Sequence, residues 1–113
     1  MANDTLNEWL FKHAKTIARA GVDCLVPQCK KFKIGKTGEK LEDRKNQPDY
    51  KDEYDHIDEV YQTSSKDEAS AMEAYLIDEF EHLEKCQNKK DGDHSLNDEM
   101  ADSDTYYVYV VWK

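Results

Sequence analysis

The sequence predicts a single α+β domain, because its 113 residues contain two helical patterns and three short runs of strand-favouring residues. We expect helices over 6–20 and 65–85, and strands over 31–35, 57–63 and 106–112. A chain of this length is large enough for one modest hydrophobic core and too small for two.

The first helix is predicted from its cap and its apolar spacing. Thr5-Leu6-Asn7-Glu8 fits a capping box, in which a hydroxyl and a carboxylate satisfy each other's free backbone donors. The apolar stripe that follows at helical spacing consists of Leu6, Trp9, Leu10, His13 and Ile17. Gly21 is a natural stop, and the short apolar piece over 22–26 is broken by Pro27. We expect His13 to be a half-buried structural histidine rather than a ligand.

The second helix carries a glutamate on its apolar face. Ser65-Lys66-Asp67-Glu68 fits another capping box. The apolar residues behind it are Ala69, Met72, Leu76, Ile77, Phe80 and Leu83. At 3.6 residues per turn, Glu73 lies inside this stripe. The acids that face away are Asp67, Asp78 and Glu81. A carboxylate that points at a core is costly unless it is paired, neutralised or bound to a metal, so Glu73 is the first candidate for a functional residue.

The strand over 106–112 is predicted from seven consecutive strand-favouring residues, Tyr-Tyr-Val-Tyr-Val-Val-Trp. Because it is apolar on both faces, we expect it to lie mid-sheet or to be covered on both sides. A helical turn over 41–45 should end before Pro48, and a polar loop over 46–59 should lead into the next strand. The Gly- and Asp-rich stretch over 89–104 is expected to be a loop.

The charge of the chain is unevenly distributed. The formal net charge is −9, but residues 28–45 contain seven basic and three acidic side chains, which is +4 and leaves −13 for the rest. Local charge decides how a surface meets phosphate. A phosphate-facing patch and an ordinary solvated lysine face are both consistent with this composition. The lysines concerned are Lys30, Lys31, Lys33, Lys36, Lys40 and Lys45.

Several features predict a cytoplasmic protein that does not span a membrane. No run approaches the roughly 18 apolar residues of a membrane-spanning helix. Residues 1–5 lack the basic-then-apolar layout of a secretory signal. The cysteines are odd in number, which predicts reduced thiols rather than disulfides. They are Cys24, Cys29 and Cys86.

Three familiar site motifs are incomplete. Gly35-Lys36-Thr37 lacks the glycine that a phosphate-binding loop carries five residues before its Gly-Lys pair, where this chain has Lys30. Asp91-Gly92-Asp93 lacks the ligand spacing of an EF-hand calcium loop. A zinc site would need a tight Cys-x2-Cys knuckle. That knuckle is missing among Cys24, Cys29, Cys86 and His94.

Four motifs remain between residues 30 and 92. They are Phe32-Lys33-Ile34-Gly35-Lys36-Thr37, Arg44, Ala69-x3-Glu73-x2-Leu76-Ile77-x2-Phe80 and Asn88. Together they resemble the second half of the GIY-YIG nuclease domain, most strongly in the glutamate helix and Asn88. The resemblance implies a small antiparallel sheet of three or slightly more strands flanked by helices. The implied single domain, 1–113, has an N-terminal helix (1–21), a motif-bearing core (30–92) and a C-terminal strand (105–113).

The resemblance also implies metal-assisted hydrolysis of a phosphodiester in nucleic acid, with DNA favoured over RNA. Glu73 matches the residue that holds one divalent ion, Mg2+ or Mn2+, and a single hard oxygen ligand suits magnesium, which keeps most of its waters. Arg44 matches the residue that binds the phosphate and stabilises charge on the phosphorane. Gly35 and Asn88 match structural positions. The lysines that would meet the nucleic-acid backbone are Lys30, Lys31, Lys33 and Lys36.

The chain departs from the family at both tyrosine motifs. Lys33 takes the place of the tyrosine of the second motif, and the segment 21–23 before it has no tyrosine for the first. The C-terminal strand resembles the family's first strand displaced to the end of the chain, as in a permuted domain. Strand alternation puts Tyr107 and Tyr109 on one face of it and Tyr106 on the other, so either face could reach the site. Tyr107 and Tyr109 are the candidate catalytic phenols. Two further candidates follow Arg44, namely Tyr50 and Tyr54.

Two other functions stay open on the sequence alone. A catalytically inactive member of the same fold would bind nucleic acid or a protein without cleaving it. An unrelated acidic protein-interaction domain would hold no ion at Glu73 and would expose an apolar patch elsewhere. A protein partner or a homodimer is compatible with each function, and the −9 charge argues against tight, indiscriminate DNA binding.

Overall fold

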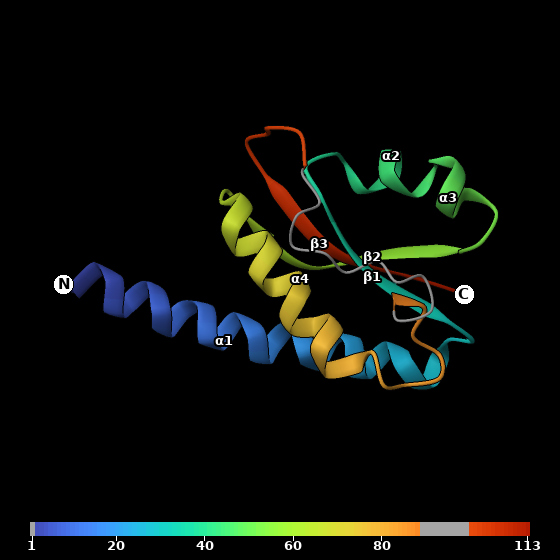
Figure 1. Ribbon diagram of the computed structural model, residues 1–113, viewed down its shortest axis with the longest axis horizontal. Coiled ribbons are helices and arrows are strands. Elements are labelled where there is room, and N and C mark those ends of the chain that lie inside the picture. The colour runs from blue at the N-terminus through green and yellow to red at the C-terminus, as the bar shows by residue number, and fades with distance from the viewer. Residues whose placement is uncertain (1, 89–99) are drawn as a thin grey trace.

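The computed structural model describes residues 2–88 and 100–113, and it shows an α+β domain with a three-stranded antiparallel sheet, as predicted (Figure 1). In chain order the elements are α1 (Ala2–Leu25), the 3-10 turn η1 (Val26–Gln28), β1 (Phe32–Thr37), α2 (Leu41–Lys45), α3 (Pro48–Lys51), β2 (His56–Thr63), α4 (Lys66–Phe80) and β3 (Tyr106–Trp112). None of the helices in these described residues is long and apolar enough to cross a membrane.

The last strand of the chain is the middle strand of the sheet. The strand order is β1-β3-β2, and β3 pairs antiparallel with both neighbours. On the β1 side Gly35 lies opposite Tyr109, and on the β2 side the register shifts between Glu59 and Tyr61. This confirms the predicted central position of the strand over 106–112.

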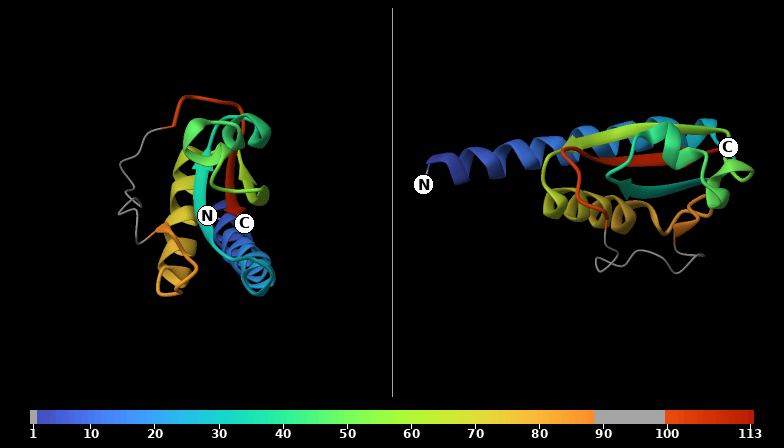
Figure 2. Two further views of the ribbon diagram at one scale, coloured as in Figure 1. Left: turned by 90° about the vertical axis from the view of Figure 1, so that its right-hand side faces the viewer. Right: turned by 90° about the horizontal axis from the view of Figure 1, so that it is seen from above.

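Helices cover both faces of the sheet. Figure 1 shows α1 and α4 on one side of the sheet and α2 with α3 on the other, and Figure 2 gives the same arrangement from two further directions. Because side chains alternate along a strand, each strand supplies both faces. The larger core lies under α1 and α4 and includes Phe32, Ile34, Met72, Leu76, Val108 and Val110. The smaller core lies under α2 and α3 and contains Tyr50, Tyr54, Tyr109 and Val111.

The first helix differs from its prediction in length and in the face that it buries. It continues through Gly21 to Leu25, because the glycine sits against Val60 inside the helix instead of ending it. The side chains packed on the larger core are Phe11, Ala14, Ala18, Val22 and Leu25. The predicted stripe lies about 120° away around the helix and is exposed at its described positions. His13 is likewise exposed, edge-on to Trp9 with ring centroids 4.1 Å apart, so the expectation of a half-buried histidine is wrong.

The cap of α4 is formed by half of the predicted capping box. The Ser65 hydroxyl accepts from the Glu68 backbone N–H at 3.2 Å, as expected. The Glu68 carboxylate instead accepts from the Tyr61 and Thr63 hydroxyls at 2.9 and 3.0 Å. The Ser65 N–H turns back to Thr63 Oγ1, so α4 is tied to the end of β2. The helix ends at Phe80 rather than near residue 85.

Two loop predictions have different outcomes. The polar segment over 46–59 contains the short helix α3, begun by Pro48 at its first turn, where proline needs no hydrogen-bond donor. Most of the expected loop over 89–104 lies outside the described residues, and the described part, 100–105, has no helix or strand.

The open edge of β1 is covered by the chain that follows α4. Phe32 exchanges backbone hydrogen bonds with Lys85 and Gln87. The fully buried Asn88 then accepts from the Ile34 N–H at 2.9 Å and donates to the Ile34 carbonyl at 2.8 Å. An exposed edge strand can pair with other chains. The Asn88 side chain prevents this at Ile34, because its amide makes the two hydrogen bonds that the backbone of a neighbouring strand would make.

We expect Asn88→Ala to lower the free energy of unfolding by about 2–4 kcal/mol, because it leaves the N–H and C=O of Ile34 buried without these partners. Urea denaturation measures the loss. Gln87→Ala is the matched control, since that side chain is only half-buried and bonds the Lys85 carbonyl nearby. Equal losses for the two variants would contradict the bracing role.

Candidate functional site

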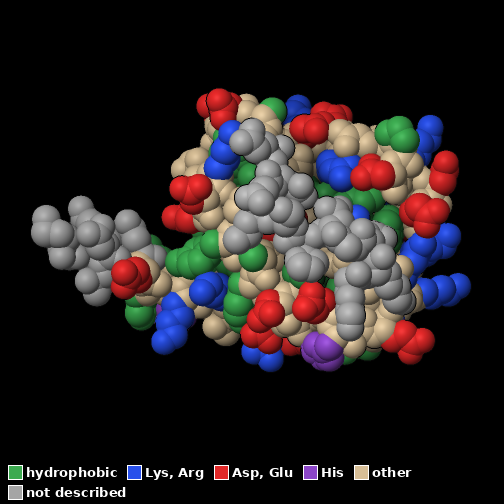
Figure 3. All heavy atoms as spheres, in the orientation of Figure 1, with side chains coloured by type: hydrophobic (Ala, Val, Ile, Leu, Met, Phe, Trp, Pro, Cys, Tyr) green, Lys and Arg blue, Asp and Glu red, His purple; other side chains and the backbone are tan. Residues whose placement is uncertain are grey.

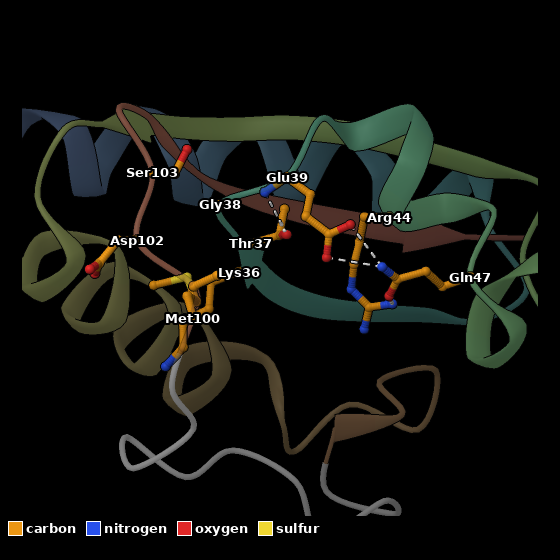
Figure 4. Close-up of a pocket in the computed structure, with 10 residues that line it drawn as sticks. Lys36, Thr37, Gly38, Glu39, Arg44, Gln47, Met100, Asp102 and Ser103 are labelled. Atoms are coloured by element: carbon orange, nitrogen blue, oxygen red, sulfur yellow. Dashed lines mark hydrogen bonds between the residues drawn. The ribbon is translucent and has the colours of Figure 1, made fainter.

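A pocket of about 430 Å³ lies at the end of β1 and contains two of the predicted site residues (Figure 4). Strand β1 and the turn after it supply Lys36 and Glu39, and the α2–α3 region supplies Arg44 and Gln47. Residues 100–103, which lead into β3, close the opposite side. The pocket therefore joins segments from three parts of the sequence.

Glu73 points inward, as predicted, and is paired with a lysine. Its Oε1 lies 3.3 Å from the Nζ of Lys36, and the two side chains are 11% and 4% exposed. Lys36 Nζ is buried and has no hydrogen-bond partner among the described residues. Lys36 shares the sheet face of Phe32 and Ile34, because it lies two and four residues further along the strand. A charge that would be costly alone is thus neutralised by a second charge from another element.

Arg44 is held by several partners at once. It forms a bidentate pair with Asp49 at 2.8 and 2.9 Å and donates to Gln47 Oε1 at 2.7 Å. Gln47 in turn donates to both carboxylate oxygens of Glu39. The guanidinium also lies 4.0 Å from the centroid of the Tyr50 ring, within the range of a cation–π interaction.

The electrostatics keep Arg44 and Asp49 charged. Burial alone would lower the pKa of Arg44, but the hydrogen bond to Asp49 reverses that effect and the net pKa is raised. The same hydrogen bond lowers the pKa of Asp49. A guanidinium fixed in this way is pre-oriented to meet an anion.

Two phenols meet beneath Arg44. The hydroxyls of Tyr50 and Tyr109 are 2.9 Å apart, and both side chains are buried. The Tyr109 ring lies directly over Gly35, where a Cβ would collide with it, so this glycine is required for packing. Burial raises the pKa of both phenols, and both therefore stay protonated at neutral pH. Lys33 Nζ is 5.9 Å from the Tyr50 ring centroid, beside the same pair.

The predicted site residues fall into two groups on opposite faces of the sheet. Arg44 and Tyr109 lie on the α2–α3 face, whereas Glu73 and Lys36 lie on the α4 face. The pocket at the end of β1 is where the two groups approach each other, because both Arg44 and Lys36 line it. Tyr107 is half-buried and lies opposite Thr37, two residues along β3 from the Tyr109–Tyr50 pair.

The other predicted lysines are placed differently from one another. Lys31 forms a 2.7 Å ion pair with Glu53 and lies over the Tyr54 ring. Lys31 and Lys33 line a second pocket of about 230 Å³, which also contains Tyr50. Lys36 is buried, so the lysines do not form one exposed row along β1.

Sequence reasoning missed the partners rather than the principal residues. Strand alternation could have placed Lys36 on the core face, with Glu73 as the natural partner for its charge. Asp49 follows Pro48 in the first turn of α3, where acids are favoured, but that helix was not predicted. Nothing local in the sequence indicates that Gln47 links Arg44 to Glu39.

The residues offer a divalent ion little more than one carboxylate. In the described ranges no group of three His, Cys, Asp or Glu side chains could hold a metal ion. Glu73 supplies hard oxygens, which suit Mg2+ if water and a phosphate complete its shell. The Lys36 ammonium beside Oε1 competes with such an ion for the same charge.

No protein-family model, no curated protein and no solved structure matches this chain.

We expect Lys36→Met to destabilise the fold by about 3–5 kcal/mol, because it leaves the Glu73 carboxylate buried without its cation. The double variant Lys36→Met with Glu73→Leu should recover most of that loss, since a buried pair replaced by apolar side chains is often neutral. Thermal and urea denaturation of the single and double variants measure the coupling. Additive losses would contradict a direct interaction.

We also expect stability to fall as the pH rises above 10, the ordinary pKa of tyrosine, because the folded state then holds phenol protons that the unfolded state has lost. Each such phenol contributes a slope of about 1.4 kcal/mol per pH unit. Urea denaturation below and above pH 10 measures the free energy of unfolding. This free energy should fall less steeply with pH in Tyr109→Phe than in the parent. Parallel pH profiles would contradict the raised pKa of Tyr109.

Proposed function

We propose that the chain is a phosphodiester hydrolase of the GIY-YIG type that acts on nucleic acid, with DNA favoured over RNA. The observation that carries the proposal is the position of β3. A displaced first strand should return to pair with the Lys-Ile-Gly strand, and β3 pairs with β1 along its whole length. Its Tyr109 is opposite Gly35 and lies over it.

Arg44 is the residue to which we assign phosphate binding. Three of its five N–H groups donate to Gln47 and Asp49, which leaves two for Tyr109 and for a phosphate oxygen. Its position is fixed before a substrate arrives, so little reorganisation is needed when negative charge develops on the phosphate. Lys36 lines the same pocket and adds a second positive charge.

Glu73 is the residue to which we assign a single Mg2+ or Mn2+ ion. When bound, such an ion polarises the phosphate and stabilises the leaving oxygen. Lys36 neutralises the carboxylate in the absence of an ion, which lowers the cost of keeping Glu73 buried.

Tyr109 is assigned a hydrogen-bonding role. Since burial raises its pKa, it is a poor base at neutral pH and is suited to share a proton in its hydrogen bond with Tyr50. Tyr50 supplies a phenol next to Lys33, the position at which the family pattern has a tyrosine.

The charge of the chain predicts weak, salt-sensitive association. Glu39 and Asp102 also line the pocket, and the chain as a whole carries −9. We also propose a cytoplasmic location, in keeping with free thiols at Cys24, Cys29 and Cys86.

A catalytically inactive nucleic-acid-binding domain of the same fold is the second candidate. The 3.3 Å contact between Lys36 and Glu73 favours it, because a protein cation already occupies the place beside the carboxylate where the enzyme would hold its ion. Arg44 would then still bind phosphate, without hydrolysis.

The enzyme proposal predicts that Glu73→Gln and Arg44→Lys each lower DNA cleavage by about 100-fold or more, because each removes charge or geometry needed in the transition state. The assay uses supercoiled DNA, single-stranded DNA and RNA, with and without Mg2+. Glu79→Gln on α4 and Arg19→Lys on α1 are matched controls outside the pocket.

The outcomes separate the two candidates. Mg2+-dependent cleavage that is lost only in Glu73→Gln and Arg44→Lys supports the enzyme. Absence of cleavage, together with DNA binding that Arg44→Lys weakens and Arg19→Lys does not, supports the binding domain. Equal behaviour of parent and all four variants contradicts both.

A further inference from the structure

Helix α1 carries a second apolar stripe that faces away from the sheet. Its members are spaced by three and four residues in turn, as in a heptad repeat, and each is exposed. They are Leu10, His13, Ile17, Ala20 and Cys24, here called the outer seam. The inner stripe of the same helix packs on the larger core, so α1 is apolar on two sides.

The large apolar side chains that are exposed among the described residues lie on or next to the outer seam. Leu10 is 50% exposed and Ile17 is 70% exposed, and Trp9 beside them is 55% exposed. Single exposed apolar residues are ordinary, but three along one helix form a patch that indicates a partner.

The outer seam is also accessible. The N-terminal half of α1 projects beyond the sheet in Figures 1 and 2. Figure 3 shows hydrophobic side chains at the surface where the projecting helix joins the body. The outer seam runs over 15 residues of this helix, about 22 Å, which is enough for a partner helix to lie along it for two heptads.

The charges on α1 suit a second copy of the same chain. The helix contains three acids and three bases, so its net charge is zero, whereas the whole chain carries −9. The acidic excess of the chain therefore does not oppose contact between two copies through this helix. Three of the positions that flank the seam are small or uncharged, namely Ala14, Thr16 and Gly21. The charged residue that flanks it is Asp23.

We propose that two copies of this chain associate through the outer seams of their α1 helices to form a symmetric dimer. The same surface is used on both copies, as in the two-fold interfaces that dominate homodimers. A membrane surface fits the same stripe less well, because helices that lie on membranes carry an excess of Lys and Arg and this one does not. The proposal is independent of the hydrolase assignment.

The test is the molar mass of the full chain in solution, measured by light scattering over a wide range of concentration with a reductant present. The parent should approach twice 13.2 kDa as the concentration rises. Ile17→Glu and Leu10→Glu should each weaken the dimer by about 100-fold or more, because two charges would then face each other across a desolvated seam. Ser64→Glu adds the same charge at an exposed site outside α1 and should remain dimeric.

Three results would overturn the dimer. A parent that stays at 13.2 kDa at every concentration would do so, as would an Ile17→Glu variant that is as dimeric as the parent. A dimer that forms only when the reductant is left out would instead be a disulfide through the exposed Cys24. Circular dichroism confirms that the glutamate variants remain folded. Sedimentation of a monomeric parent with phosphatidylserine vesicles would assign the seam to a membrane.

Discussion

The structure depends on the pairing of its last strand with its first and second. Strand β3 comes at the end of the chain, yet it separates β1 from β2 and contributes buried side chains to both cores. Without it, β1 and β2 would have no common neighbour, and the helices on either face would lose the surface they share. Val108 and Val110 serve the core under α1 and α4, while Tyr109 and Val111 serve the core under α2 and α3. The same seven residues thus fix the relative positions of Arg44 and Glu73, which approach the sheet from opposite sides.

The sequence predicted those helices and strands whose residue pattern fits only one arrangement in a fold. The α4 helix has a single apolar stripe, so its buried face and the inward Glu73 follow from spacing. The strand over 106–112 is apolar on both faces, which is compatible only with a covered position. Helix α1 is different, because it has two apolar stripes and nothing local decides which one meets the sheet. The predicted stripe, which has the bulkier residues, is the one that the structure leaves exposed. The inner stripe of smaller side chains, such as Ala14 and Ala18, lets the helix lie closer to the core.

The sequence singled out Arg44, Glu73 and Tyr109 but not their partners. Glu73 points inward as predicted, whereas Lys36, which was expected to meet a nucleic-acid backbone, is buried beside it. The contacts between them depend on strand alternation and on a helix, α3, that is only four residues long. Such a helix leaves no periodicity to detect. Its Asp49 and Tyr50 nevertheless decide how Arg44 is oriented, through a bidentate pair and a stacked ring. Pairings of this kind belong to tertiary structure, and no local propensity encodes them.

Under the proposed function, an acidic chain has to present cations to a phosphate, and the arrangement of charges limits how strongly it can do so. Both cations that line the pocket are already compensated, Arg44 by Asp49 and Lys36 by Glu73. A phosphate that enters must share these cations with carboxylates. Its binding free energy is therefore smaller than the number of positive groups suggests. An ion at Glu73 would change that balance, because it would take over the carboxylate and leave the Lys36 ammonium to the phosphate. Ion and substrate would then favour each other's binding, which is the reciprocal coupling expected of two ligands that share one charged pair.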